Sequence, residues 1–420
     1  MPNKKHKQSQ QSKQKLANAH HRNDFFKRLD SYCKSITGED VLKLIPRNEL
    51  DKIYLTRSRS LIVEPEPGHI IPSQIIEAIR VIVNSCFKQI TIPIEKTNKT
   101  VTISENYSMG LSLYMHLIYI ESRNYKNSEK VKALLFDTCG DIRFLFDIIY
   151  DKLIDDIFPY LILVTNNLCL HYFSYRLETA TPDDAWGARF KIIVKKYAPE
   201  KINIDIDSNS RPAYRIGWTF KADAFEWLYV TPLQLGINSA FDNLEIPVYI
   251  QMHALQRLIE RIDCLHPAYL LSGIYDSLRA CNVVNNKDKF IIEYTVLNVK
   301  VGYLSALMVE GKLVIRTFLF LTYNGTPEGK RLEEFVGLKK LDTKYLKMDK
   351  LSSFMSNKLS SNEELRSIFS KADCLHLVEL YDKLDKFTAV HRENSPIELL
   401  SSYLKTNDIK LDEWVFEENI

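Results

Sequence analysis

The segment VYIQMHALQRLIERI, residues 248–262, carries the strongest pattern in the chain. Its His253, Arg257 and Arg261 are spaced four residues apart, so on an α-helix they fall within an arc of about 80°. The residues of the opposite side are apolar: Leu255, Leu258, Ile259 and Ile262. The segment therefore predicts an amphipathic helix, over residues 252–263, with an imidazole and two guanidinium groups on its polar face.

This polar face has the side chains that metal-free cleavage of RNA requires. The reaction needs proton transfer at the ribose 2′-hydroxyl and at the leaving oxygen, and positive charge around the phosphorane. Histidine suits proton transfer because an imidazole ordinarily titrates near neutral pH. Arg257 and Arg261 can each bind a phosphate through paired hydrogen bonds. A solvated helix face with His–Arg and Arg–Glu pairs is the alternative, and the helix alone does not decide between them.

A predicted strand, LVIRTFLFLT (313–322), adds two candidate residues. Alternation places Arg316 on one face with Phe318 and Phe320, and Thr317 on the other face. An arginine within so apolar a strand is costly unless it is paired or belongs to a site. Arg316 is therefore either a second phosphate ligand or the partner of an acidic residue on a neighbouring strand.

Polar residues follow this strand where the next helix, over residues 326–337, is predicted to begin. Thr326 suits the N-cap and Pro327 the first helical position. Backbone N–H groups at such a helix start favour anions, and a simple capped turn is the alternative. The candidate nucleic-acid contacts of this turn are Tyr323, Lys330 and Arg331.

The charge of the chain limits what it can bind. Its 420 residues contain 56 Lys and Arg against 53 Asp and Glu, a net charge of +3, so a polyanion must bind at a local patch. Residues 1–23 are rich in Lys, Gln and Ser and contain no acid, which predicts a disordered basic arm. Lys4, Lys5 and Lys7 would bind nucleic acid there, although the arm equally suits a solubilising tail.

The cysteines and the apolar runs indicate a cytoplasmic protein. The seven cysteines are scattered without a CxxC pair, which favours reduced thiols over disulfides or zinc. The most apolar run, IFPYLILV at 157–164, is too short to span a membrane. The nucleotide-loop and zinc-protease motifs are missing as well, so we expect no cofactor, no metal and no membrane partner.

The periodicity of the chain predicts an α+β fold. Five regions follow from it: a disordered basic arm at 1–23, a mainly helical domain at 24–158, a central antiparallel β region at 159–245, a helix–helix–antiparallel-sheet unit at 246–345, and a helical C-terminal region at 346–420. The first strand of the β region is expected within 161–177. In the fourth region two helices precede three strands, with Glu310-Gly311 as a tight hairpin connection.

The element order of residues 246–345 resembles the small bacterial ribonuclease toxins of the RelE/BrnT type, which are grouped with barnase-like and colicin-type nucleases. Some branches begin with His-Ala-Leu-x-Arg-hydrophobic-x-x-Arg, and residues 253–261 are HALQRLIER. The resemblance implies that His253 and Arg257 are active-site residues and that Arg316 or Thr317 supplies the contribution of the strand. The chain departs from that family in being much longer and near neutral.

Together these patterns predict a metal-independent endoribonuclease, a toxin or antiviral effector of bacterial defence, that cleaves RNA by 2′-hydroxyl attack. The alternatives are a non-enzymatic subunit of an intracellular assembly, and an RNA- or DNA-binding protein without cleavage. An inhibitory or assembly protein is a further expected partner. A concave site that contains His253 and Arg316 would favour the enzyme, whereas a large exposed apolar patch would favour the assembly subunit.

Overall fold

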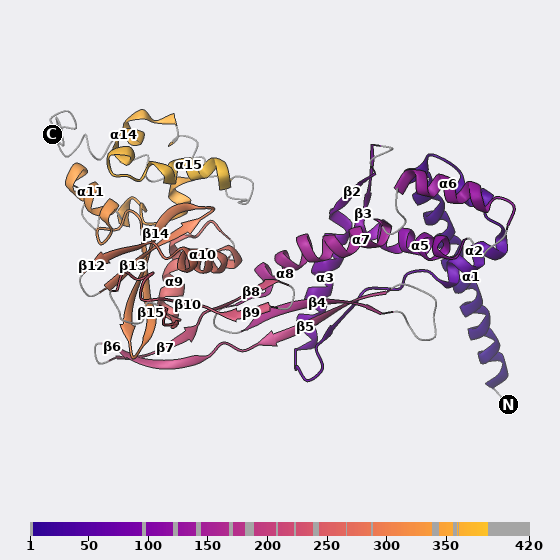
Figure 1. The fold of residues 1–420 in the computed structure, drawn as a ribbon, viewed down its shortest axis with the longest axis horizontal. Coiled ribbons are helices and arrows are strands. Elements are labelled where there is room, and N and C mark those ends of the chain that lie inside the picture. Colours follow the sequence, from indigo (N-terminus) through magenta and orange to yellow (C-terminus); the bar gives the residue numbers. More distant parts are fainter. Residues whose placement is uncertain are drawn as a thin grey trace. The chain divides into compact units, whose positions relative to one another are not determined.

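The chain forms two compact units, and the α+β class predicted from the sequence is confirmed (Figure 1). The first unit comprises residues 1–162, 173–196 and 221–224, and the second comprises 163–172, 197–220 and 225 onwards. No helix in the part that the structure covers is long and apolar enough to cross a membrane. The computed structural model describes residues 3–94, 98–120, 125–139, 144–167, 171–180, 189–206, 209–221, 224–237, 243–265, 267–286, 289–337, 344–355, 359 and 361–384.

The first unit is mainly helical, as predicted for residues 24–158. In α3 the buried side chains recur at helical spacing, at Ile76, Ile79, Val83 and Phe87, which explains why this segment forms an amphipathic helix. The helical segments are α1 (Asn3–Thr37), η1 (Val41–Leu44), α2 (Arg47–Leu55), α3 (Ser73–Gln89), α4 (Ile103–Glu105), η2 (Asn106–Gly110), α5 (Leu111–Ile118), α6 (Ser128–Cys139), α7 (Phe144–Lys152), η4 (Leu153–Ile157) and α8 (Phe158–Thr165).

The N-terminal arm differs from the prediction of disorder. Helix α1 begins at Asn3, so nearly all of the segment 1–23 is helical. Lys, Gln and Ala are favourable helix formers, and neither Gly nor Pro interrupts residues 3–37. The backbone of Lys4, Lys5 and Lys7 lies in the first turns of this helix, and their side chains fall outside the described part of the structure.

The strands of the predicted β region do not form one domain. Most of β4 (Tyr172–Ala180) and β5 (Arg189–Tyr197) belongs to the first unit, where β5 also pairs in parallel with β1 (Ile62–Pro65). A hairpin of β2 (Thr91–Ile94) and β3 (Lys99–Thr102) lies in the same unit. By contrast, β6 (Lys201–Ile206) and β7 (Asn209–Arg215) join the sheet of the second unit. Alternation identified these strands, but their partners are distant in sequence and leave no local signal.

The strand expected within 161–177 is wrong in its first half. Residues up to Thr165 are the end of helix α8, and β4 begins only at Tyr172. A short apolar run such as LILV has no periodicity that separates a buried helix from a buried strand.

The second unit is built on an eight-stranded mixed sheet of the described residues. Its order is β12-β13-β14-β15-β11-β7-β6, with β10 beside β11. Strand β11 was not predicted, and it pairs in parallel with β15, so the sheet is not purely antiparallel as expected. The bounds of the remaining strands are β8 (Gly217–Lys221), β9 (Ala224–Trp227), β10 (Tyr229–Val230), β11 (Ile246–Gln251), β12 (Val283–Asn286), β13 (Lys289–Val296), β14 (Val299–Val309) and β15 (Lys312–Phe320).

Helices pack against this sheet and share one apolar core with it. Helix α9 (Met252–Arg261) contacts β15, and α10 (Pro267–Ala280) contacts β13 (Figure 1). Helical segments after the sheet contribute Phe354 and Phe369 to the same core, so the described residues after 346 are not a separate region. Residues 385–420 lie outside the described part. The later segments are α11 (Pro327–Val336), η5 (Leu351–Phe354), α14 (Glu363–Lys371) and α15 (Leu375–Leu384).

Two predicted connections are confirmed. Glu310 and Gly311 have φ values of +50° and +73°, the backbone conformation of a tight hairpin turn between β14 and β15. Helix α11 begins with Pro327, and the Thr326 hydroxyl accepts a hydrogen bond from the Gly329 N–H as the N-cap.

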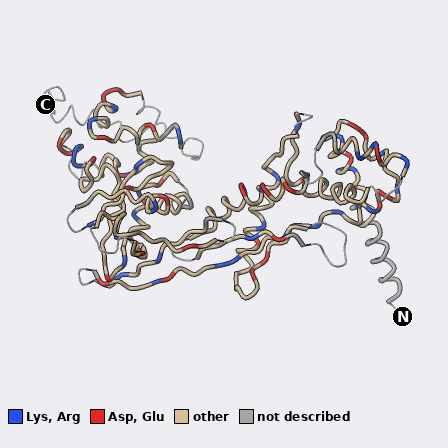
Figure 2. Tube along the Cα trace, viewed as in Figure 1, with Lys and Arg blue, Asp and Glu red and all other residues tan. Residues whose placement is uncertain are grey.

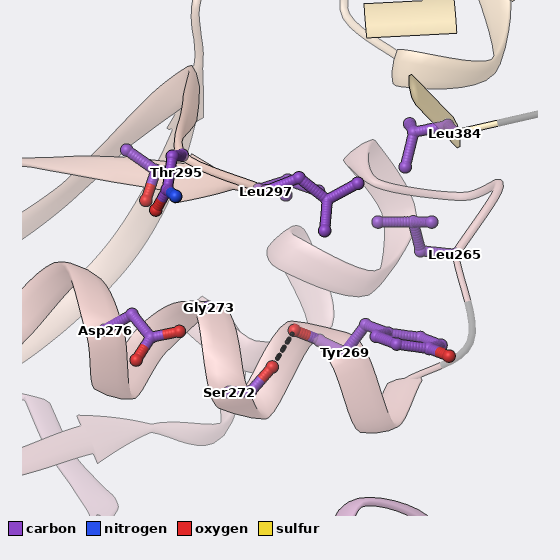
Figure 3. A pocket seen from close by; sticks show the side chains of 10 residues that line it. Leu265, Tyr269, Ser272, Gly273, Asp276, Thr295, Leu297 and Leu384 are labelled. Atoms are coloured by element: carbon purple, nitrogen blue, oxygen red, sulfur yellow. Dashed lines mark hydrogen bonds between the residues drawn. The ribbon is translucent and has the colours of Figure 1, made fainter. Parts of the chain in front are cut away.

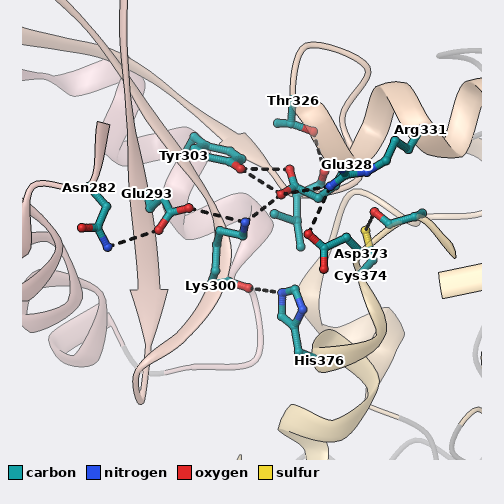
Figure 4. Close-up of polar contacts among 12 residues, drawn as sticks. Asn282, Glu293, Lys300, Tyr303, Thr326, Glu328, Arg331, Asp373, Cys374 and His376 are labelled. Carbon is teal, nitrogen blue, oxygen red and sulfur yellow. Dashed lines mark hydrogen bonds and ion pairs between the residues drawn. The ribbon is translucent and has the colours of Figure 1, made fainter. Parts of the chain in front are cut away.

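A buried carboxylate in the first turn of α11 joins this helix to the sheet (Figure 4). The Glu328 side chain is only 2% exposed and lies 2.7 Å from the Lys300 ammonium. The Tyr303 hydroxyl donates to the same carboxylate at 2.9 Å. Burial opposes the charged form of Lys300, but the hydrogen bond and charge of Glu328 outweigh it and raise the pKa of Lys300. The network also reaches Arg331, 3.8 Å from the carboxylate.

We predict that Glu328→Gln lowers the free energy of unfolding by about 3 kcal/mol, because it removes the nearer of the two carboxylates that pair with a largely buried ammonium. Urea denaturation followed by tryptophan fluorescence measures the change. Glu334→Gln on the same helix is the control, since this exposed carboxylate pairs with Lys330 at only 3.8 Å and should change stability by less than about 0.5 kcal/mol. Equal effects of the two substitutions would contradict the prediction.

A second polar cluster ties β7 and β11 together. The Tyr249 hydroxyl donates to Glu200 at 2.7 Å, and the Arg215 guanidinium donates to the other carboxylate oxygen at 2.9 Å. The hydrogen bond from Tyr249, with that from Arg215, lowers the pKa of Glu200. Burial and the bond to Glu200 raise the pKa of Tyr249 to about 12. The cluster thus favours an ionised Glu200 beside a neutral Tyr249.

We predict that Glu200 stabilises the fold near neutral pH but not in acid. Because its folded-state pKa lies below its ordinary value of 4.5, its contribution is present above that value and is lost as the pH falls through the folded-state pKa. The difference in urea midpoint between wild type and Glu200→Gln should therefore shrink as the pH falls from 7 to 3. For the exposed control Glu310→Gln, the difference in urea midpoint from wild type should stay constant across this range. A constant difference for Glu200→Gln as well would refute the prediction.

Candidate active site

The predicted amphipathic helix begins where a buried strand ends. Strand β11 is buried along nearly its whole length and runs to Gln251, which is the N-cap of α9, and helical spacing begins with the residues that follow. Ala254 and Leu258 face the core, while His253 lies exposed in the first turn. The predicted polar face is therefore confirmed for residues 252–261, and the four residues before it belong to the sheet.

His253 borders a pocket of about 280 Å³, called here the histidine pocket. Four of the predicted catalytic residues line it, together with Tyr323 from the predicted anion-binding turn. Its lining residues are His253, Arg257, Arg261, Thr317, Phe318, Leu319, Phe320, Tyr323 and Asp349. The structure thus brings together residues from α9, from the end of β15 and from two later turns.

His253 also borders a second pocket, of about 300 Å³, called here the basic pocket. Its lining residues are Arg211, Gln251, His253, Lys289, Ser305, Arg316 and Thr317. Three of them are Lys or Arg, and no carboxylate occurs among the described residues of the lining. The fifth predicted catalytic residue, Arg316, lies here, and both His253 and Thr317 are common to the two pockets.

A β-bulge explains how Arg316 and Thr317 reach the same pocket. Ser305 of β14 pairs with Thr317, but the next residue, Ala306, pairs with Ile315, so β15 has one extra residue at Arg316. Odd-numbered residues such as Ile315 therefore face this core before the bulge, and even-numbered residues such as Phe318 face it after the bulge. The prediction that Arg316 shares a face with Phe318 and Phe320 is therefore wrong, because alternation does not continue through a bulge.

Arg261 is held in an ion pair rather than offered to a ligand. Its guanidinium pairs with the Asp349 carboxylate and also donates to the Asp349 carbonyl oxygen at 3.3 Å. Burial, with the nearby charge of Arg257, lowers the pKa of Arg261. Asp349 balances much of this charge, so Arg261 anchors the end of α9 to the chain near residue 349. This pairing leaves less of the Arg261 charge for the phosphate-binding role expected from the sequence.

Arg257 is better placed to bind a ligand. It pairs with Glu260 at 2.8 Å, one turn along the same helix, and both side chains are about half exposed. An exposed pair of this kind contributes little free energy, so a phosphate can compete for the guanidinium.

The nucleic-acid contacts predicted for the turn after β15 fall into two groups, because Tyr323 lines a pocket and the two basic residues do not. Tyr323 lines the histidine pocket, and its backbone is fixed by bonds from its N–H to the Phe320 carbonyl and from the Thr326 N–H to its own carbonyl. Lys330 is exposed beside Glu334, and Arg331 pairs with Asp373 at 3.1 Å. Neither Lys330 nor Arg331 lines the two pockets.

Five polar lining residues were not predicted from the sequence: Arg211, Gln251, Lys289, Ser305 and Asp349. Arg211, Lys289 and Ser305 come from three different strands, and each looks like an ordinary polar position in its own segment. Gln251 carried the one available signal, since an uncharged polar residue ends the apolar run VYI directly before the helix.

A further pocket, of about 240 Å³, lies between α10 and the β13–β14 hairpin (Figure 3). Its polar side chains include Asp276, whose pKa is raised by burial, and Ser272, which donates to the Tyr269 carbonyl at 3.0 Å. Neither histidine nor a cation occurs among its described lining residues, so it lacks the chemistry of the other two pockets.

The surroundings of the site add two findings. Lys and Arg are interspersed with Asp and Glu along the described chain (Figure 2). Among the described residues, no three His, Cys, Asp or Glu side chains cluster in a way that could hold a metal ion.

No protein-family model, curated protein or solved structure matches the chain.

We predict that Gly329→Ala destabilises the protein by about 1–3 kcal/mol, because a Cβ there would lie 2.0 Å from the Tyr323 carbonyl oxygen. The sign is informative, since Gly→Ala in an unhindered helix raises stability by about 1 kcal/mol. Thermal and urea unfolding measure it, with Glu333→Ala on the same helix as the control. A stabilised Gly329→Ala variant would show that the Tyr323 turn is not fixed by this contact.

Proposed function

We propose that the second unit is a metal-independent endoribonuclease, as the resemblance to RelE/BrnT-type toxins implies. The observation that supports this most directly is the position of His253 where two pockets meet. An exposed imidazole there can reach a bound phosphodiester from one side, with Arg257 in one pocket and Arg316 in the other. The described cysteines that form no disulfide suit a reducing cytoplasm, which is where we place the protein; they are Cys33, Cys86, Cys264, Cys281 and Cys374.

In the proposed reaction the ribose 2′-oxygen attacks the adjacent phosphorus and gives its proton to His253. The bond from phosphorus to the 5′-oxygen breaks, and that oxygen takes a proton from the Tyr323 hydroxyl. The products are a 2′,3′-cyclic phosphate and a free 5′-hydroxyl. Arg257 and Arg316 stabilise the charge that develops on the phosphorane oxygens.

A nucleic-acid-binding protein without cleavage is the second candidate, because the cations of the basic pocket would serve simple binding equally well. Substitution of His253 distinguishes the two functions. A cleaving enzyme depends on its imidazole, whereas a binder depends on the positive charges around it.

We predict that the full chain cleaves single-stranded RNA in the presence of EDTA. His253→Ala should lower kcat at least 100-fold, which is the usual effect of removing a general acid or base. The products should carry 2′,3′-cyclic phosphate ends, and an all-deoxy strand of the same sequence should stay intact. Tyr323→Phe should lower kcat with little change in KM.

Arg257→Ala should also lower kcat/KM. Its matched control is Arg80→Ala, because Arg80 and Glu77 form the same type of ion pair, three residues apart, on helix α3 of the first unit. RNA binding without cleavage by wild type, undiminished in His253→Ala, would leave the binding protein as the better description. Cleavage that EDTA abolishes would refute the metal-independent mechanism.

A further inference from the structure

The basic pocket contains a buried hydrogen-bond donor without a partner. The Gln251 side chain lines this pocket and the residue is 2% exposed, yet its amide nitrogen makes no hydrogen bond within the described part of the chain. Such a donor costs about 1–3 kcal/mol in a folded protein, and its presence calls for an explanation. A ligand that accepts its hydrogen bond would provide one.

The groups around Gln251 all favour an anion. Arg211, Lys289 and Arg316 come from β7, β13 and β15, and the hydroxyls of Ser305 and Thr317 lie in the same lining. Ammonium and guanidinium groups act only as donors, and hydroxyls and amides can also donate. A ligand that satisfies this set must carry several oxygen acceptors and negative charge, as a phosphate does.

The start of α9 adds to this preference. Gln251 is the N-cap of the ten-residue helix and makes no side-chain cap hydrogen bond, so its amide is not used to satisfy the first turn. The partial positive charge of a helix N-terminus favours an anion beside it.

We propose that the basic pocket is a phosphate-binding subsite for the nucleotide next to the cleaved bond. This rests on the proposed function, since His253 and Thr317 belong to both pockets. The two phosphates then lie side by side, and the several N–H donors of Arg316 serve both of them. The volume of about 300 Å³ exceeds what one phosphate fills, which leaves room for part of its ribose. The substrate class is then a single RNA strand with a phosphate flanking the scissile one.

Binding of inorganic phosphate and pyrophosphate to the full chain tests the pocket without any cleavage. Isothermal titration should show that Gln251→Leu and Lys289→Ala each weaken binding at least tenfold, whereas Lys344→Ala, an exposed lysine outside both pockets, has no effect. Gln251→Leu should unfold at the same or higher urea concentration than wild type, because it removes an unpaired buried donor. Unchanged binding in both pocket variants would overturn the subsite.

Cleavage kinetics then test the relation between the two pockets. Three dinucleotides are compared: one with only the scissile phosphate, one with an added 5′-phosphate and one with an added 3′-phosphate. One added phosphate should lower KM about tenfold in wild type and leave it unchanged in Gln251→Leu. Cleavage with no response to either phosphate would refute the subsite and leave the nuclease standing.

Phosphate binding without cleavage would also distinguish the subsite from the proposed nuclease. Phosphate binding that depends on Gln251, in a protein that cleaves no RNA, would remove the proposed nuclease and keep the pocket as a phosphate site of a binding protein.

Discussion

The arrangement of the second unit depends on one pairing, that of β11 with β15. The two strands run parallel, with Val248 beside Leu313 and Ile250 beside Ile315. Parallel strands end at the same edge of a sheet, so the turn from β11 into α9 lies at the level of the bulge in β15. Because of this register, His253 lines the same pocket as Arg316 and Thr317, although more than sixty residues separate them in the chain.

The local features of the site were accessible from the sequence, and its assembly was not. Helical spacing predicted the polar face with His253 and Arg257, and cap chemistry predicted the start of α11 at Thr326. The parallel strand β11, the bulge at Arg316 and the Arg261–Asp349 ion pair all depend on segments that meet only in the folded sheet. Binary pattern carries no information about such partners, so Arg261 was assigned to a ligand and Gln251 was overlooked.

Electrostatics explains how the proposed phosphate site is compatible with a nearly neutral chain. Two carboxylates beside the histidine pocket are already paired, Asp349 with Arg261 and Glu260 with Arg257. The basic pocket has three cations and no carboxylate in its described lining, so its field is local and falls off within about 10 Å at moderate ionic strength. The proposed contact therefore uses the charge of this pocket rather than that of a whole surface.

The span of the site along the chain has a consequence for protein synthesis. The histidine pocket includes residues from His253 to Asp349, and the basic pocket begins at Arg211. A nascent chain therefore lacks a complete histidine pocket until residue 349 has left the ribosome, and any shorter fragment lacks the Arg261 partner. If the protein attacks RNA, the cell that makes it is spared from that activity until most of the polypeptide has been translated.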